Sequence, residues 1–96
     1  MTRGQSRKCG DIAERYGRRN QEKQAISELS ELLYVLTRRP DQRKIDWKND
    51  LIDEIADVTI MLEQLRLIYD IENDEINERI NFKLNRQRER IKAENG

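Results

Sequence analysis

The amino-acid sequence predicts an all-α protein, a bundle of about four helices in each chain that is completed by oligomerisation. Apolar residues recur at three- and four-residue intervals through most of the chain, the spacing of amphipathic helices. The isoleucines, which are the only strand-like signal, fall on this same spacing. Charged residues make up 40% of the 96 positions and hydrophobic residues 35%, a mixture that suits amphipathic helices better than a self-sufficient core.

The beginning of the chain is expected to hold a tail and a short helix. Residues 1–5 read as a flexible tail, and residues 6–96 as a single all-α domain. Ser6 is the expected cap of the short first helix. This helix should run to Tyr16, where Gly17 offers a left-handed stop.

Three longer helices follow, and their ends are marked by residues with local preferences. Pro40 prevents the first of them from continuing, because proline lacks an N–H and blocks the preceding residue from helical geometry. Asp46 and Asn73 are good N-caps after the two interruptions that follow. The helices are therefore expected over about 20–38, 47–70 and 73–93.

Composition excludes several classes of function. Lys and Arg total 19, as do Asp and Glu, so no overall field attracts nucleic acid or an anionic membrane. The absence of histidine excludes His-based zinc sites and His acid–base catalysis. Cys9 is the single cysteine, which fits a reducing cytoplasm. No apolar run is long enough to span a bilayer. We expect a cytoplasmic protein without a nucleic-acid or membrane partner.

Acidic residues share a face with apolar ones in the expected helix over 47–70. A helix turns about 100° per residue, which places Asp50, Glu54 and Asp57 on a face that continues into Met61 and Ile68. The main core stripe of this helix is expected to hold Leu51, Ile55, Val58, Leu62, Leu65 and Tyr69. Its solvent side is expected to hold Thr59, Glu63 and Arg66.

The helix over 20–38 repeats this arrangement. Glu28 and Glu31 are one turn apart, and their face continues into Leu32 and Val35. The apolar side of this helix is expected to hold Ala25, Ile26, Leu29, Leu33 and Leu36. If the two helices pack antiparallel, their acidic pairs can face each other.

Four carboxylates in one pocket repel, since one pair at 4 Å costs roughly 4 kcal/mol at an effective dielectric of about 20. Such a cluster holds protons or cations. Oxygen ligands without His or Cys favour Mg²⁺, with Mn²⁺ as the second choice. Spaced acids on a helix are also common on wet surfaces, but two such pairs beside apolar positions favour a site.

These acidic motifs resemble those of a known family. Residues SELSE at 27–31 and DEIAD at 53–57, in the context AISELSELL, LIDEIADVTIMLEQL and NFKLNRQRERI, are similar to the paired motifs of MazG-like nucleotide pyrophosphohydrolases in the all-α NTP pyrophosphatase superfamily. The resemblance covers about residues 11–92. Ser27 departs from the family pattern, which has an acid there, so the number of metal ions stays open.

The resemblance implies hydrolysis of a nucleoside triphosphate to the monophosphate and pyrophosphate by a bacterial or phage-encoded enzyme. It implies Mg²⁺ ligation by Glu28, Glu31, Glu54 and Asp57. Glu31 and Glu54 are the expected catalytic residues, with Glu31 as a candidate base. The family is usually a homodimer or a dimer of dimers.

Further residues are candidates for the remaining contacts. Lys83 and Arg86, on the last helix, are the expected phosphate-binding residues, and the NFK segment resembles a family pattern. Trp47 and Gln24 are the expected base-binding residues, with Tyr16 as another candidate for stacking. A packing role for Trp47 is the alternative. Outer ligands of the metal are expected in Asp50 and Asp53.

Two other functions compete with the enzyme. The first is a non-enzymatic helical interaction or regulatory module, which amphipathic helices also suit and which needs no metal. The second is nucleic-acid binding through N-terminal basic residues, which acids interrupt and which few aromatics accompany. These basic residues are Arg3, Arg7, Lys8, Arg15, Arg18 and Arg19.

Overall fold

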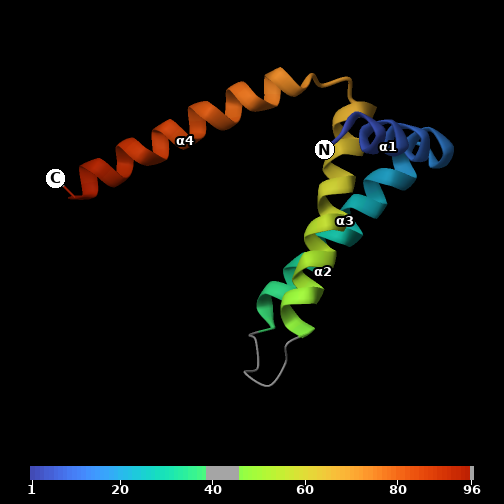
Figure 1. Cartoon of the computed structure of the whole chain (residues 1–96), viewed down its shortest axis with the longest axis horizontal. Coiled ribbons are helices and arrows are strands. Elements are labelled where there is room, and N and C mark those ends of the chain that lie inside the picture. Colours follow the sequence, from blue (N-terminus) through green and yellow to red (C-terminus); the bar gives the residue numbers. More distant parts are fainter. Residues whose placement is uncertain (39–45, 96) are drawn as a thin grey trace.

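The computed structural model describes residues 1–38 and 46–95, and these form four helices without a strand. The helices are α1 (Arg3–Tyr16), α2 (Arg18–Thr37), α3 (Asp46–Ile68) and α4 (Asn73–Asn95). The all-α prediction is confirmed. Figure 1 shows α2 and α3 side by side and antiparallel, α1 across one end of this pair, and α4 extending away from all three.

Helix α1 begins at Arg3, so residues 3–5, which the sequence predicts in a flexible tail, are helical. Thr2 Oγ1 accepts a hydrogen bond from Gln5 N at 3.1 Å, while Gln5 Oε1 accepts one from Thr2 N at 2.9 Å. This reciprocal capping box begins α1 at Arg3. Ser6 therefore is no cap. Its hydroxyl donates to Glu63 Oε2 at 2.6 Å and ties α1 to α3.

Gly17 separates α1 from α2, as the sequence predicts. Its φ of 88° and ψ of 159° belong to a region that is essentially restricted to glycine. The Gly17 N–H donates to the Ala13 carbonyl at 2.9 Å, and α2 begins at the very next residue. A single glycine therefore turns the chain so that α1 folds back over the α2–α3 pair.

The ends of α3 and α4 differ from the prediction by small amounts. The last turn of α3 closes with Asp70 at φ 52° and with Ile71 N donating to the Arg66 carbonyl at 2.9 Å, which is a Schellman-type end. At the start of α4, Glu72 takes the capping position, since its N–H donates to Glu75 Oε2 at 2.8 Å. Asn73 is the first helical residue and not the cap. Pro40 and most of the predicted loop lie outside the described residues.

The core lies between α2 and α3. Its buried apolar side chains include Ala25, Val35, Val58 and Met61. The expected core stripe of α3 is wrong for its outer members, since Ile55, Leu62 and Tyr69 are about half exposed at 49%, 55% and 47%. On α2 the same holds for Ile26, Leu29, Leu33 and Leu36. The buried face of each helix lies between the expected apolar stripe, which supplies Ala25 and Val58, and the acidic face, which supplies Val35 and Met61.

Two polar contacts fix how the helices pack. Gln21 and Gln64 are buried, and Gln21 Nε2 donates to Gln64 Oε1 at 2.7 Å. Glu63 and Arg66 were expected on the solvent side of α3. Their side chains are only 12% and 13% exposed and form an ion pair of 2.7 Å, because α1 covers this side.

Helix α4 buries none of its residues. Its apolar side chains Ile76, Ile80, Leu84 and Ile91 are all exposed. The four predicted helices are present, but only α1, α2 and α3 pack closely against one another, while α4 extends away from them (Figure 1). The apolar stripe of α4 therefore lacks a partner among the described residues of the single chain. An isolated helix is only marginally stable in water.

No helix among the described residues is both long and apolar enough to cross a membrane.

Candidate metal centre

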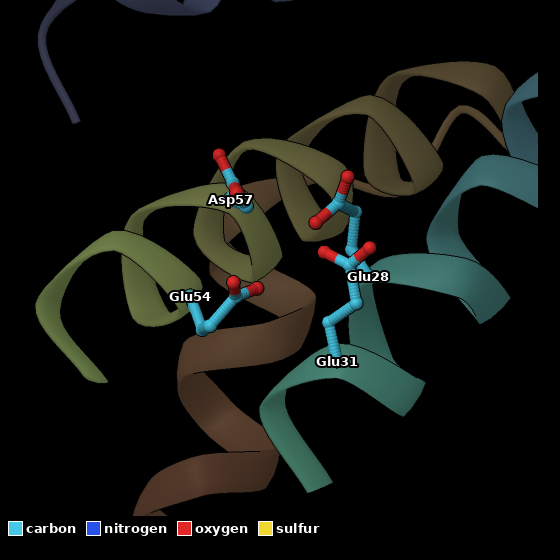
Figure 2. A group of neighbouring side chains, drawn as sticks. All are labelled: Glu28, Glu31, Glu54 and Asp57. Atoms are coloured by element: carbon cyan, nitrogen blue, oxygen red, sulfur yellow. The ribbon is translucent and has the colours of Figure 1, made fainter. Parts of the chain in front are cut away.

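Four carboxylates meet between α2 and α3. Glu28, Glu31, Glu54 and Asp57 each offer one oxygen, and these four oxygens lie within 4.8 Å of one another. Figure 2 shows the acids of α2 and of α3 directed toward the same space between the helices. The structure thus brings together all four residues predicted as metal ligands.

Helix geometry explains why these four side chains converge. In each helix the two acids are three residues apart, so they occupy neighbouring turns of one face. Because α2 and α3 run antiparallel, the two faces meet along the same stretch of the seam (Figure 1). Neighbouring polar contacts hold the α2 side, where Gln24 Nε2 donates to Glu28 Oε1 at 2.9 Å.

The acids are partly removed from water. Glu28, Glu54 and Asp57 are half-buried, while Glu31 is exposed at the edge of the cluster. Within the described part of the chain, Oε2 of Glu28 and Oε2 of Glu54 are buried and accept no hydrogen bond. Buried carboxylate oxygens normally have a partner, so two such oxygens in one cluster need an explanation.

The electrostatics agree with this geometry. Burial raises the pKa of the Glu54 carboxyl above its ordinary value, and the negative charges of Asp57 and Glu28 raise it further. Burial and the nearby Glu28 likewise raise the pKa of Asp57. The cluster is therefore costly when it is fully ionised and bare. A bound cation would reverse this cost by supplying the opposite charge.

The residues fit a hard divalent cation. All four ligands are carboxylates, which Mg²⁺ and Mn²⁺ prefer. Two oxygens of these residues, Oε2 of Glu28 and Oε2 of Glu54, are buried without a partner in the described chain, and a bound ion would supply one. An exposed acidic group alone would give no such indication, but partly buried and unpaired oxygens from two helices do.

The expected outer ligands are in different surroundings. Asp50 Oδ2 accepts a hydrogen bond from Arg38 Nη2 at 3.0 Å, so this carboxylate already has a counter-charge. Asp53 is exposed, and its charge contributes to the raised pKa of both Glu54 and Asp57. Ser27, where the family pattern has an acid, is exposed and is not part of the cluster.

Trp47 and Gln24 lie at opposite ends of the seam. The indole N–H of Trp47 donates to the Val35 carbonyl at 2.9 Å and so clamps the start of α3 to the end of α2. Gln24 is eleven residues before Val35, about 16 Å along the helix at 1.5 Å per residue. One nucleobase cannot contact both residues. The observed hydrogen bond matches the packing role that the sequence left open for Trp47.

Gln24 lines a groove that the sequence reading missed. This groove, called the α1 groove below, has a volume of about 640 Å³ and lies among α1, α2 and α3. Gln24 connects the groove directly to the four-carboxylate cluster through its hydrogen bond to Glu28. No sequence signal placed α1 there, because its position follows from the turn at Gly17. Lining residues include Ile12, Tyr16, Asn20, Gln24, Ile60 and Gln64.

Lys83 and Arg86 are not brought to the cluster within one chain. Both are exposed on α4, which extends away from the α2–α3 pair (Figure 1). The guanidinium of Arg86 lies 5.8 Å from the centroid of the Phe82 ring, which is within the distance of a cation–π pair. Arg38, which the sequence analysis did not single out, pairs with Asp50 on the α2–α3 seam at 3.0 Å.

No family model matches the chain, and neither a curated protein nor a solved structure matches it. The resemblance to MazG-like enzymes therefore stays a prediction from the acidic sequence motifs.

Proposed function

We propose that this chain is a Mg²⁺-dependent nucleoside triphosphate pyrophosphohydrolase, which converts an NTP or dNTP and water into the monophosphate and pyrophosphate. One observation carries the proposal. Two helices bring four carboxylate oxygens within 4.8 Å of one another. Oε2 of Glu28 and Oε2 of Glu54 are buried without a hydrogen-bond partner in the described chain. This arrangement is costly unless it serves to bind cations.

The residues have separate roles in this proposal. Glu28, Glu54 and Asp57 are half-buried and would hold the ion, together with Glu31 at the exposed edge. When bound, Mg²⁺ would neutralise and orient the phosphates, which is most of what phosphoryl transfer requires. Glu31 is exposed beside the cluster, where it can accept a proton from the attacking water. Glu54 is the second catalytic residue of the proposal and is also one of the metal ligands.

Self-association is part of the proposal. One chain leaves the apolar side chains of α4 exposed, together with Ile26, Leu29, Leu33 and Leu36 on α2. A homodimer or a dimer of dimers would cover these residues. The α4 helix of a second copy could then carry Lys83 and Arg86 to the phosphates, which α4 of the same chain does not do.

The test is an assay of pyrophosphate release from a panel of canonical and modified NTPs and dNTPs with Mg²⁺. We expect monophosphate and pyrophosphate in equal amounts, and no activity in EDTA or in Glu54→Gln. Glu78→Gln serves as the matched control, since Glu78 is an exposed acid on α4 outside the cluster. Activity that survives EDTA or Glu54→Gln would refute the proposal.

The exposed apolar residues of α4 also favour a second candidate, a non-enzymatic helical interaction or regulatory module. This module would use α4 as a ligand for a partner helix or groove. It predicts no gain in melting temperature from millimolar Mg²⁺ or Mn²⁺, whereas the enzyme predicts a clear gain.

A further inference from the structure

We propose that the nucleotide lies along the α2–α3 seam in one direction, with its nucleoside in the α1 groove and its two outer phosphates at Arg38. This inference rests on the proposed function and specifies how the substrate occupies the same site. The four-carboxylate cluster lies between the α1 groove and Arg38, so the α-phosphate would lie at the carboxylates.

The α1 groove has the character of a nucleoside site. Its volume of about 640 Å³ is within the range of small-ligand pockets. The ring of Tyr16 is 59% exposed and Ile12 is 41% exposed, so both offer an accessible apolar surface for stacking a base. Amides of Asn20 and Gln24 line the same groove and can donate or accept hydrogen bonds.

The α1 groove lies beside the four-carboxylate cluster, at the end of the α2–α3 pair that α1 crosses. Gln24 lines the groove, and its Nε2 donates to Glu28 Oε1 at 2.9 Å. On the facing helix, Ile60 and Met61 line the groove and follow Asp57 by one turn. A nucleoside in the groove would therefore have its 5′ side near the carboxylates.

Arg38 stands at the other end of the cluster. Its backbone N–H donates to the Tyr34 carbonyl at 3.1 Å and its guanidinium lies 5.1 Å from the Tyr34 ring centroid, so the side chain is held at the end of α2. It reaches Asp50 at 3.0 Å, one turn before Glu54 on α3. This places it about 8 Å along the helix axis from the middle of the cluster, at 1.5 Å per residue.

The guanidinium of Arg38 has a hydrogen-bond donor without an acceptor in the described chain. Nη2 donates to Asp50, but Nε is buried and has no hydrogen-bond partner in the described chain. A guanidinium has five donors in a planar fork that fits phosphate oxygens bidentately. A buried donor without a partner is costly, and a phosphate group would supply the missing acceptor.

The reaction gives this direction a chemical reason. Attack of water on the α-phosphorus forms a new P–O bond and breaks the bond between the α-phosphorus and the bridging oxygen. The electron pair of the broken bond stays on the leaving pyrophosphate, and the proton of the water passes to a carboxylate such as Glu31. Arg38 would stabilise the charge that develops on the leaving group. The reverse direction would place the triphosphate against Ile12 and Tyr16.

The inference is tested by calorimetric titration of the purified full-length protein with pyrophosphate and, separately, with nucleoside monophosphates, both in excess Mg²⁺. For Arg38→Ala we expect pyrophosphate affinity to fall about tenfold or more, as loss of a charged contact implies, while monophosphate affinity changes by less than about twofold. For Tyr16→Ala we expect the opposite pattern. Arg7→Ala, an exposed arginine on α1, is the matched control for Arg38→Ala.

Circular dichroism shows whether each variant folds. If Arg38→Ala does not fold, Arg38→Lys replaces it, since lysine keeps the charge next to Asp50 but cannot bind bidentately; weaker pyrophosphate binding is again expected. Unchanged pyrophosphate affinity in the folded variant, or a loss of pyrophosphate affinity in Tyr16→Ala, would overturn the direction. Wild-type protein that binds neither Mg²⁺ nor pyrophosphate and hydrolyses no NTP would instead remove the proposed function.

Discussion

Glu28 on α2 and Glu54 on α3 belong to one carboxylate cluster between two antiparallel helices, and each has an Oε2 atom that is buried without a hydrogen-bond partner in the described chain. The two residues belong to a cluster whose carboxylate oxygens come within 4.8 Å of one another. Like charges at this separation repel, and burial strengthens the repulsion. The repulsion therefore destabilises the seam between α2 and α3 when it is bare, and a bound cation would relieve it.

Divalent cations should stabilise the protein. A ligand that binds only the folded state at ten times its dissociation constant adds about 1.4 kcal/mol. For a domain of this size we expect a rise in melting temperature of roughly 6–11 °C with Mg²⁺ or Mn²⁺, measured by circular dichroism or calorimetry. Glu78→Gln should respond like the wild type.

Removal of one acid from the cluster should make the metal-free protein more stable. Glu54→Gln removes a carboxylate whose pKa is raised by burial and by its acidic neighbours, so the metal-free variant should melt a few degrees above the metal-free wild type at neutral pH. The variant should gain little from Mg²⁺. A metal-free variant that melts below the wild type would show that the cluster is not strained.

Glu63 should contribute to stability only above acidic pH. The hydrogen bond from Arg66, with a second one from Ser6, lowers the pKa of Glu63 from its ordinary 4.5 to about 2. Because the folded-state pKa is the lower one, this stability is complete above pH 4.5 and is lost as the pH falls toward about 2. A shift of this size corresponds to at most about 3 kcal/mol at neutral pH.

The measurement is urea unfolding of Glu63→Gln and wild type at several pH values. We expect the variant to be less stable at pH 7, and the two curves to converge on acidification. Glu89→Gln is the matched control. Glu89 also pairs with a residue three positions away, Lys92 at 3.3 Å, but it is 72% exposed and should matter little. An equal effect of both variants would contradict the role of the Ser6–Glu63–Arg66 contact.

The buried amide pair should be sensitive to single replacement. Gln64→Met leaves the Gln21 amide without its 2.7 Å partner in the core, which costs about 1–3 kcal/mol. The double variant Gln21→Met with Gln64→Met should recover much of this loss, since no polar group is then stranded. Thermal unfolding of Gln21→Met, Gln64→Met and the double variant checks this. Additive losses would mean that the hydrogen bond contributes nothing special.

Self-association should be visible in solution. Light scattering at micromolar concentration should give a mass above the 11.5 kDa of one chain. Leu33→Asp should reduce the mass while the helical content is retained, because Leu33 is 63% exposed in the single chain and is expected in the interface. Ser27→Asp, on the polar side of α2, should leave the mass unchanged. A monomeric wild type would contradict the proposed assembly.

Local sequence patterns predict the all-α class, the approximate limits of the helices, and the placement of Glu28 with Glu31, and of Glu54 with Asp57, on one face of each helix. Each of these follows from local rules, namely helical periodicity, the residues that interrupt helices, and the three-residue spacing of the acids. Tertiary packing selects which apolar side chains of α2 and α3 are buried, because periodicity finds two adjacent apolar faces on each helix and does not rank them. Ile55 and Leu62 were therefore assigned to the core although they are about half exposed.

The tertiary structure also decided the surroundings of the cluster. The turn at Gly17 folds α1 over the helix pair, which creates the α1 groove and buries Glu63 beside Arg66. The position of Arg38 beside Asp50 depends on how the end of α2 meets the start of α3. These contacts join residues that are distant in the sequence, and no local preference encodes the distance between them.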